Sequence, residues 1–120
     1  MNVGKENIIK LKSFGFALKI IELSQFLIQN KKEFVLSKQI LRSGTAIGAL
    51  VRESEHAESK IDFIHKLAIA QKESNETQYW LELLISSWFA DQEVWGNMLS
   101  ENKEISRILV AIIVSFKKNL

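Results

Sequence analysis

Apolar residues recur every three or four positions along almost the whole chain, which is the period of an α-helix. The pattern is interrupted at three short polar stretches. It predicts four helices, over residues 7–30, 34–57, 60–89 and 91–118. Ser59 and Asp91 stand at two of the interruptions as N-cap residues. Long helices joined by short turns predict an all-α fold, an up-down-up-down antiparallel four-helix bundle that forms a single domain over residues 1–120.

The first predicted helix carries two apolar rows, although one row is enough to pack a helix into a bundle. One row is Leu11, Phe14, Leu18, Ile21, Gln25 and Ile28, and the other is Phe16, Ile20, Leu23 and Leu27. We therefore expect this helix to be buried on two sides, by its own bundle and by a neighbouring subunit. Lys5, Lys12 and Lys19 recur every seven residues and are expected to form its solvent-facing stripe.

Each of the other three helices has one predicted inward row. In the second helix it is Leu36, Ile40, Gly44, Ile47 and Val51. In the third it is Ile64, Leu67, Gln71, Ser74, Gln78, Leu81, Ile85 and Trp88, apolar at both ends and polar in the middle. In the fourth it is Trp95, Met98, Asn102, Ile105, Leu109, Ile112 and Phe116. We interpret Trp80, Trp88 and Trp95 as packing residues.

Two glycines, Gly44 and Gly48, lie one turn apart inside the second helix, where each costs about 1 kcal/mol relative to alanine. The spacing of four suits a contact face, so we predict the close approach of another helix. The polar middle of the third helix (Gln71, Ser74 and Gln78) is the expected neighbour. A bend of the second helix at the glycines is the alternative.

Composition and charge exclude several classes of function. The 120 residues include no cysteine and no proline, so disulfide and thiolate chemistry are absent and long helices are favoured. No apolar run reaches the roughly 18 residues of a membrane helix, and the N-terminal stretch lacks the features of a signal peptide. A cytoplasmic protein without a membrane partner is expected. The formal net charge is +2, with +4 on residues 1–60 and −2 on residues 61–120.

A metal site is one possible chemistry, because Glu53/His56 and Asp62/His65 have the acid-x-x-His spacing of di-iron bundles. Both pairs lie near the same turn, and the first helix offers only Glu22 in its middle. No Ser-His-Asp or Cys-His arrangement and no glycine-rich phosphate loop is visible. We therefore expect no catalytic residue, no metal, no cofactor and no small-molecule substrate.

Paired carboxylates on the third helix offer a second possible chemistry. Glu73 and Glu76 lie about one turn apart, with Glu82 further along. Such groups can perform acid–base catalysis, or they can accept hydrogen bonds and charge from Arg42 or Arg52 on the second helix. We favour the second interpretation, an ion-pair network between helices that fixes their register.

Basic residues on the first two helices are candidate contacts for nucleic acid. For a single subunit an ordinary solvated surface is the favoured interpretation, whereas a ring of identical subunits would repeat the charges and strengthen their field. The candidates are Lys5, Lys10, Lys12, Lys19, Lys31, Lys32, Lys38, Arg42 and Arg52.

Residues 41–84 resemble the bacterial four-helix bundle family named after proteins encoded in intervening sequences of 23S ribosomal RNA genes. The matching positions are Arg42, Ser43, Ala46, Ile47, Val51, Arg52, Glu53, Phe63, Ala70, Glu73, Ser74 and Glu76, with Gly44 and Gly48 in the same stretch. Leu50 stands where the family usually has asparagine, and Ala46 where serine is common. If those polar positions bind something in other members, part of that contact is missing here.

The resemblance implies a four-helix bundle, commonly assembled as a homopentamer with a central channel, and it implies no known reaction. The accessory proteins of diversity-generating retroelements look like the same pentameric barrel, bind nucleic acid and engage a reverse transcriptase. The leading expectation is a non-enzymatic homo-oligomer that binds RNA, DNA or a ribonucleoprotein. The alternative is a protein–protein interaction scaffold that binds no nucleic acid.

Overall fold

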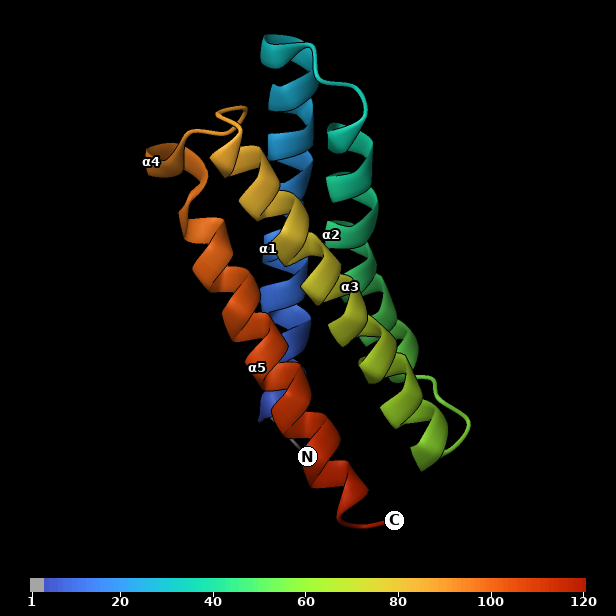
Figure 1. The fold of residues 1–120 in the computed structure, drawn as a ribbon. Helices are drawn as coiled ribbons and strands as arrows, with labels where there is room; N and C mark the ends of the chain where they lie inside the picture. Colours follow the sequence, from blue (N-terminus) through green and yellow to red (C-terminus); the bar gives the residue numbers. More distant parts are fainter. Residues whose placement is uncertain (1–3) are drawn as a thin grey trace.

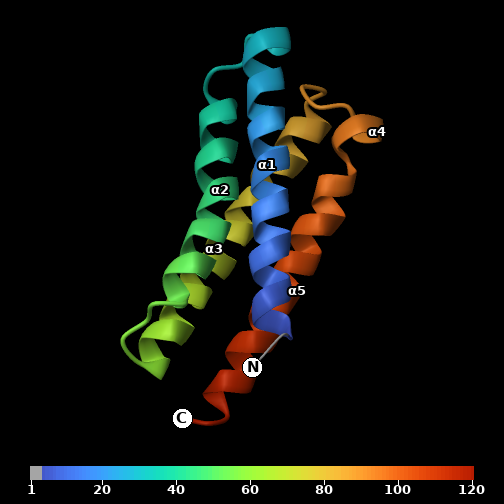
Figure 2. The ribbon, with the colours of Figure 1, turned by 180° about the vertical axis from the view of Figure 1, so that it is seen from behind.

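Four long helices and one single-turn helix form the protein in a computed structural model that describes residues 4–120 (Figure 1). The helices are α1 (Lys5–Lys31), α2 (Leu36–Ser54), α3 (Lys60–Ser86), α4 (Gln92–Trp95) and α5 (Asn97–Lys117). The long helices run alternately up and down, as the view from behind also shows (Figure 2). No strand occurs within residues 4–120. The predicted all-α, up-down-up-down four-helix bundle is confirmed.

Local sequence signals set the helix ends. The Ser59 hydroxyl accepts a hydrogen bond from the Asp62 backbone N–H at 3.0 Å and so caps α3. The Asp91 carboxylate accepts one from the Glu93 backbone N–H at 3.3 Å and caps α4. Each cap satisfies a backbone donor that has no partner within its helix. Both caps lie where the sequence predicts them.

The end of α3 departs from the prediction at Trp88. The Trp88 backbone adopts a left-handed conformation, with φ 69°, so the chain leaves the helix there. Its indole is 86% exposed. The prediction that Trp88 belongs to the inward row is therefore wrong, because the helical period no longer applies beyond Ser86. Trp80 and Trp95 are partly buried against the core, as expected of packing residues.

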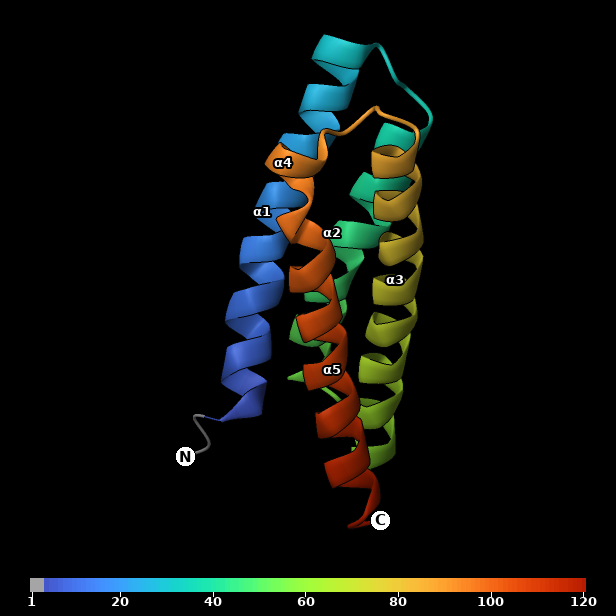
Figure 3. The same ribbon diagram turned by 60° about the vertical axis from the view of Figure 1, so that its left-hand side comes forward.

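The predicted fourth helix is broken at Gly96. A Cβ atom on Gly96 would lie 2.4 Å from the Gln92 carbonyl oxygen, so the junction between α4 and α5 has room only for glycine. The short α4 lies beside α1 near the end of the bundle (Figure 3). There the ring centroids of Trp95 and Phe26 are 5.5 Å apart. The prediction of one continuous helix over 91–118 is wrong because it overlooked this glycine.

The core is formed by apolar residues from all four long helices. Of the two apolar rows of α1, the bundle buries the one with Phe16, Ile20, Leu23 and Leu27. The other row carries five large side chains that are between 37% and 75% exposed, namely Leu11, Phe14, Leu18, Ile21 and Ile28. We call these five residues the α1 outer row. Within one chain, therefore, α1 is buried on one side only.

Gly44 and Gly48 do allow a close helix approach, but the approaching helix is α1. A Cβ atom on Gly44 would lie 2.6 Å from atoms of the Ile20 side chain. On Gly48 it would lie 3.4 Å from the Ser13 carbonyl oxygen. The predicted approach to α3 is wrong because the glycines point to the other neighbour of α2. The preceding residue, Ser43, makes the contact with α3.

Alanine at these two glycines should affect the free energy of unfolding differently. Gly48→Ala meets ordinary van der Waals contact and gains about 1 kcal/mol of helix propensity. Gly44→Ala overlaps the fully buried Ile20, and overpacking of a core costs roughly 1–3 kcal/mol. We expect the free energy of unfolding of Gly44→Ala, measured by urea denaturation, to be about 1–3 kcal/mol lower than that of Gly48→Ala. Equal stabilities would contradict the packing of α1 on Gly44.

Candidate nucleic-acid interface

Three of the candidate lysines on α1 are already paired with glutamates. The pairs are Lys10–Glu55, Lys12–Glu104 and Lys19–Glu101, with N–O distances of 3.1, 3.1 and 2.6 Å. The last two pairs join α1 to α5. Exposed ion pairs contribute about 0–1 kcal/mol each, so they hold the helices only weakly. Their main effect is to reduce the positive potential of the predicted Lys5/Lys12/Lys19 stripe.

Arg42 of α2 binds both of the carboxylates that the sequence places about one turn apart on α3. Its guanidinium donates to Glu73 at 3.2 Å and also to Glu76. The Trp80 indole N–H donates to Glu76 at 2.9 Å. The indole hydrogen bond and the Arg42 charge hold the pKa of Glu76 below its usual value, and the hydrogen bond to Glu76 raises the pKa of Arg42. The predicted network between helices is confirmed for Arg42.

Arg52, the other proposed partner of these carboxylates, lies elsewhere. Its guanidinium carbon is 5.3 Å from the ring centroid of Phe14, a cation–π contact between α2 and α1. Lys31, Lys32 and Lys38 lie around the turn between α1 and α2. Among the described residues, these four side chains and Lys5 form no ion pair. Of the nine candidate cations, four are thus held by glutamates, and Arg52 lies against an aromatic ring.

The α1 outer row repeats with the a and d spacing of a coiled coil, with Gln25 completing the series. Beside it, between α1 and α2, lies a depression of about 260 Å³. Small residues line much of this depression, namely Ala17, Thr45, Gly48 and Ala49. A ridge of large apolar side chains beside a shallow hollow is the surface on which another helix packs.

A sequence model of the family described as 23S rRNA-intervening sequence protein matches residues 5–111. This chain belongs to that family. It is also similar to the crystal structure of a protein of unknown function from the S23 ribosomal protein family of Bacteroides thetaiotaomicron VPI-5482. The two are 52% identical over 91% of this chain and 97% of the other, with a TM-score of 0.88. No curated protein matches the chain.

In this member of the 23S rRNA-intervening sequence protein family, the motif residues join helices. Thr77 and Ser43 share a 2.9 Å hydrogen bond, Glu53 pairs with Lys66 at 3.4 Å, and the rings of Phe63 and Phe116 are 4.7 Å apart. Ile47 is fully buried, and Ser74 is hydrogen-bonded to Asn102. Leu50, which replaces the usual asparagine of the family, packs partly against the core. The residues that carry the resemblance thus shape the bundle.

The acid-x-x-His pairs stay near the turn between α2 and α3. Glu53 is paired with Lys66, and the Asp62 carboxylate accepts a hydrogen bond from the Glu58 backbone N–H at 3.2 Å. Within residues 4–120, no three His, Cys, Asp or Glu side chains are grouped so that they could hold a metal ion. No helix in that range is long and apolar enough to cross a membrane.

Two cations that sequence reasoning did not single out lie on α5. Lys103 and Arg107 line a groove between α3 and α5. Their spacing of four places them on one face of the helix, and this is the signal that could have found them. Neither forms an ion pair with another described residue.

Proposed function

We propose that this chain is the subunit of a non-enzymatic homo-oligomer that binds nucleic acid or a ribonucleoprotein as an accessory factor. The pentameric state is the one that the family resemblance implies. Self-assembly is the step for which the surface of the chain gives the strongest support, and nucleic-acid binding is the activity that assembly would enable.

The α1 outer row is the observation that carries this proposal. Five large apolar side chains on one helix form a long exposed patch, and such patches mark interaction surfaces. Their heptad spacing matches the seam by which one helix packs on another. A second copy of the chain supplies helices of the right length as partners. Burial of this row would also account for its apolar character, which a solvated helix face does not need.

Assembly would increase the positive potential that is available to bind nucleic acid. One chain has a formal net charge of only +2, and four of its nine candidate cations are paired with glutamates. In a closed ring each unpaired cation is repeated around the symmetry axis, so the fields of the copies add. The proposal therefore places binding in the assembled protein.

The test is a fluorescence-anisotropy titration of labelled structured RNA, single-stranded RNA and duplex DNA with the assembled protein. At about 50 mM salt we expect binding, and at about 200 mM salt an affinity lower by orders of magnitude if six or more phosphates are contacted. The same titration with an acidic protein of similar size provides the control. If folded, assembled protein binds none of the three nucleic acids at low salt, the nucleic-acid part of the proposal fails.

A protein–protein interaction scaffold remains the second candidate. The observation that favours it is the pairing of Lys10, Lys12, Lys19 and Arg42, which lowers the positive potential of α1 and α2. This candidate predicts the same self-assembly without nucleic-acid binding. The titration therefore separates the two.

A further inference from the structure

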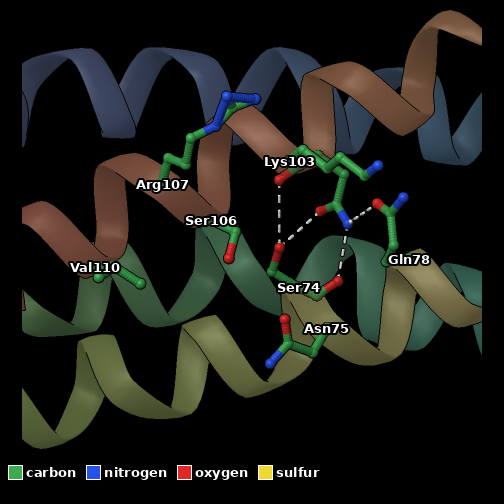
Figure 4. A pocket seen from close by; sticks show the side chains of 8 residues that line it. Ser74, Asn75, Gln78, Lys103, Ser106, Arg107 and Val110 are labelled. Atoms are coloured by element: carbon green, nitrogen blue, oxygen red, sulfur yellow. Dashed lines mark hydrogen bonds between the residues drawn. The ribbon is translucent and has the colours of Figure 1, made fainter.

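A groove of about 670 Å³ runs between α3 and α5 near the middle of the bundle (Figure 4). Ser74 and Gln78 lie at its inner side, and Asn75, Lys103 and Arg107 lie along its edges. The buried Asn102 also lines it. The groove is on a different side of the bundle from the α1 outer row. It is lined by α3 and α5 alone, so its shape is set by two rigid helices.

The inner side of the groove is a satisfied polar network. The Ser74 hydroxyl donates to the Asn102 side-chain oxygen at 2.8 Å. The Asn102 amide donates to the Ser74 carbonyl at 2.8 Å and to the Gln78 side-chain oxygen at 2.9 Å. Ser74 and Asn102 are almost completely buried. These hydrogen bonds fix the two helices, so the groove does not need a ligand to keep its form.

The edges of the groove are different, because their polar groups have no partner. Within residues 4–120, the side chains of Asn75, Lys103, Ser106 and Arg107 form no hydrogen bond or ion pair. Two are cations and two are neutral groups that can donate hydrogen bonds. Four unpartnered donors along one groove suit a ligand that offers negatively charged acceptor oxygens.

The unpartnered state of Lys103 and Arg107 contrasts with the pairing of the α1 lysines. Arg107 also lines a neighbouring depression that contains Glu101 and Glu104. Those two carboxylates are engaged by Lys19 and Lys12 at 2.6 and 3.1 Å. Lys103 and Arg107 therefore stay unpaired among the described residues, as does Lys5 in the depression that Arg107 also lines, and they are available to bind an external anion.

We propose that the groove between α3 and α5 binds the phosphodiester backbone of a single nucleic-acid strand. The inference rests on the proposed nucleic-acid binding and locates it on residues other than the α1 and α2 lysines. Lys103 and Arg107 are one helical turn apart, about 6 Å along the axis, and contact phosphate oxygens. Asn75 and Ser106 donate to phosphate or sugar oxygens, and the half-exposed Val110 contacts a sugar or a base.

A single strand is the occupant that the shape favours. The groove is a concave space between two helices, and a strand can enter it with its backbone against the cations. A duplex would meet only the edges of the groove. A free nucleotide offers fewer phosphates, so its binding would be weaker than that of a strand that spans both cations.

The test compares two double variants that each remove two positive charges, Lys103→Gln/Arg107→Gln in the groove and Lys117→Gln/Lys118→Gln at the end of α5, away from the groove and from every candidate contact. All four residues are exposed, so both variants should fold and assemble, which circular dichroism and sedimentation check. For labelled single-stranded RNA we expect the groove variant to bind more weakly. The slope of log affinity against log salt should fall by about 1.4 per groove, at about 0.7 for each lost phosphate contact. The Lys117/Lys118 variant should keep the wild-type slope.

The outcomes separate this inference from the proposed function. If wild-type protein binds the strand and the two variants lose affinity equally, or the groove variant loses none, the groove is not the site and the proposed function stands. If a nucleoside monophosphate binds as tightly as the strand, the groove holds a small phosphate ligand and the strand assignment is wrong. If wild-type protein binds no nucleic acid at low salt, both proposals fail.

Discussion

Replacing Leu18 with glutamate is expected to convert the proposed homo-oligomer into folded monomers. Leu18 lies in the middle of the α1 outer row and is about half exposed in the single chain, so the substitution leaves the core of the bundle intact. In an assembly that buries this row, the new carboxylate would lie in an apolar interface. Burying an unpaired charge there costs several kcal/mol per contact. Since each 1.4 kcal/mol is a factor of ten, we expect the dissociation constant to rise about 100-fold or more.

Sedimentation velocity measures this effect directly, and Asn30→Glu is the matched control. Asn30 is exposed on the same helix but is not part of the α1 outer row. The control adds the same charge and should keep the mass of the wild-type assembly. A Leu18→Glu protein that sediments like the wild type, with unchanged helix content, would exclude this row from the interface.

Replacing Asn102 with aspartate is expected to cause the largest loss of folding stability. Asn102 is only 1% exposed, and its amide donates to two acceptors, the Ser74 carbonyl and the Gln78 side-chain oxygen. Aspartate has nearly the same shape, but its carboxylate cannot donate to either. Leaving an uncompensated charge in the core costs about 3–5 kcal/mol, a large part of the 5–15 kcal/mol typical of a domain.

The stability of Asn102→Asp should also depend on pH. Burial and the neighbouring acceptors disfavour the charged form, so the pKa of the new carboxyl is raised in the folded state. The folded protein then binds more protons than the unfolded chain above the ordinary pKa of aspartate. Stability is therefore greatest below that value and falls as pH rises through the folded-state pKa.

Urea denaturation at acidic and neutral pH checks both expectations, with Asn97→Asp as the control. Asn97 is exposed at the start of α5, where a carboxylate interacts favourably with the helix dipole. We expect the control to change stability by less than about 0.5 kcal/mol. If Asn102→Asp is as stable as Asn97→Asp at neutral pH, the polar network between α3 and α5 is not buried as described.

Hydrophobic periodicity and capping residues were sufficient to predict the architecture. The row of α2 with Ile40, Gly44, Ile47 and Val51 is buried because spacings of three and four place these residues on one face. Ser59 and Asp91 cap helices because their side chains satisfy backbone donors locally. Such signals act within a few residues, so a single sequence contains them in full.

Features that depend on the arrangement of distant helices were not predictable in the same way. Both rows of α1 consist mainly of large apolar residues at the helical period. Periodicity alone therefore does not show which row faces the core. The partner of Gly44 depends on which side of α2 each neighbouring helix occupies. The Lys12–Glu104 pair joins residues 92 positions apart, so the sequence could not reveal that the predicted basic stripe is partly neutralised. The groove with Lys103 and Arg107 exists only once α3 and α5 are placed side by side.

The central claim is that copies of this chain assemble through the α1 outer row, and the molar mass of the wild-type protein tests it most directly. Light scattering across a dilution series should give a mass that is a whole multiple of the 13.8 kDa chain, five times that value for the pentamer. The mass should persist at high salt because the row is apolar. A mass of 13.8 kDa at every concentration would contradict the account, since the exposed row would then have no second copy to cover it.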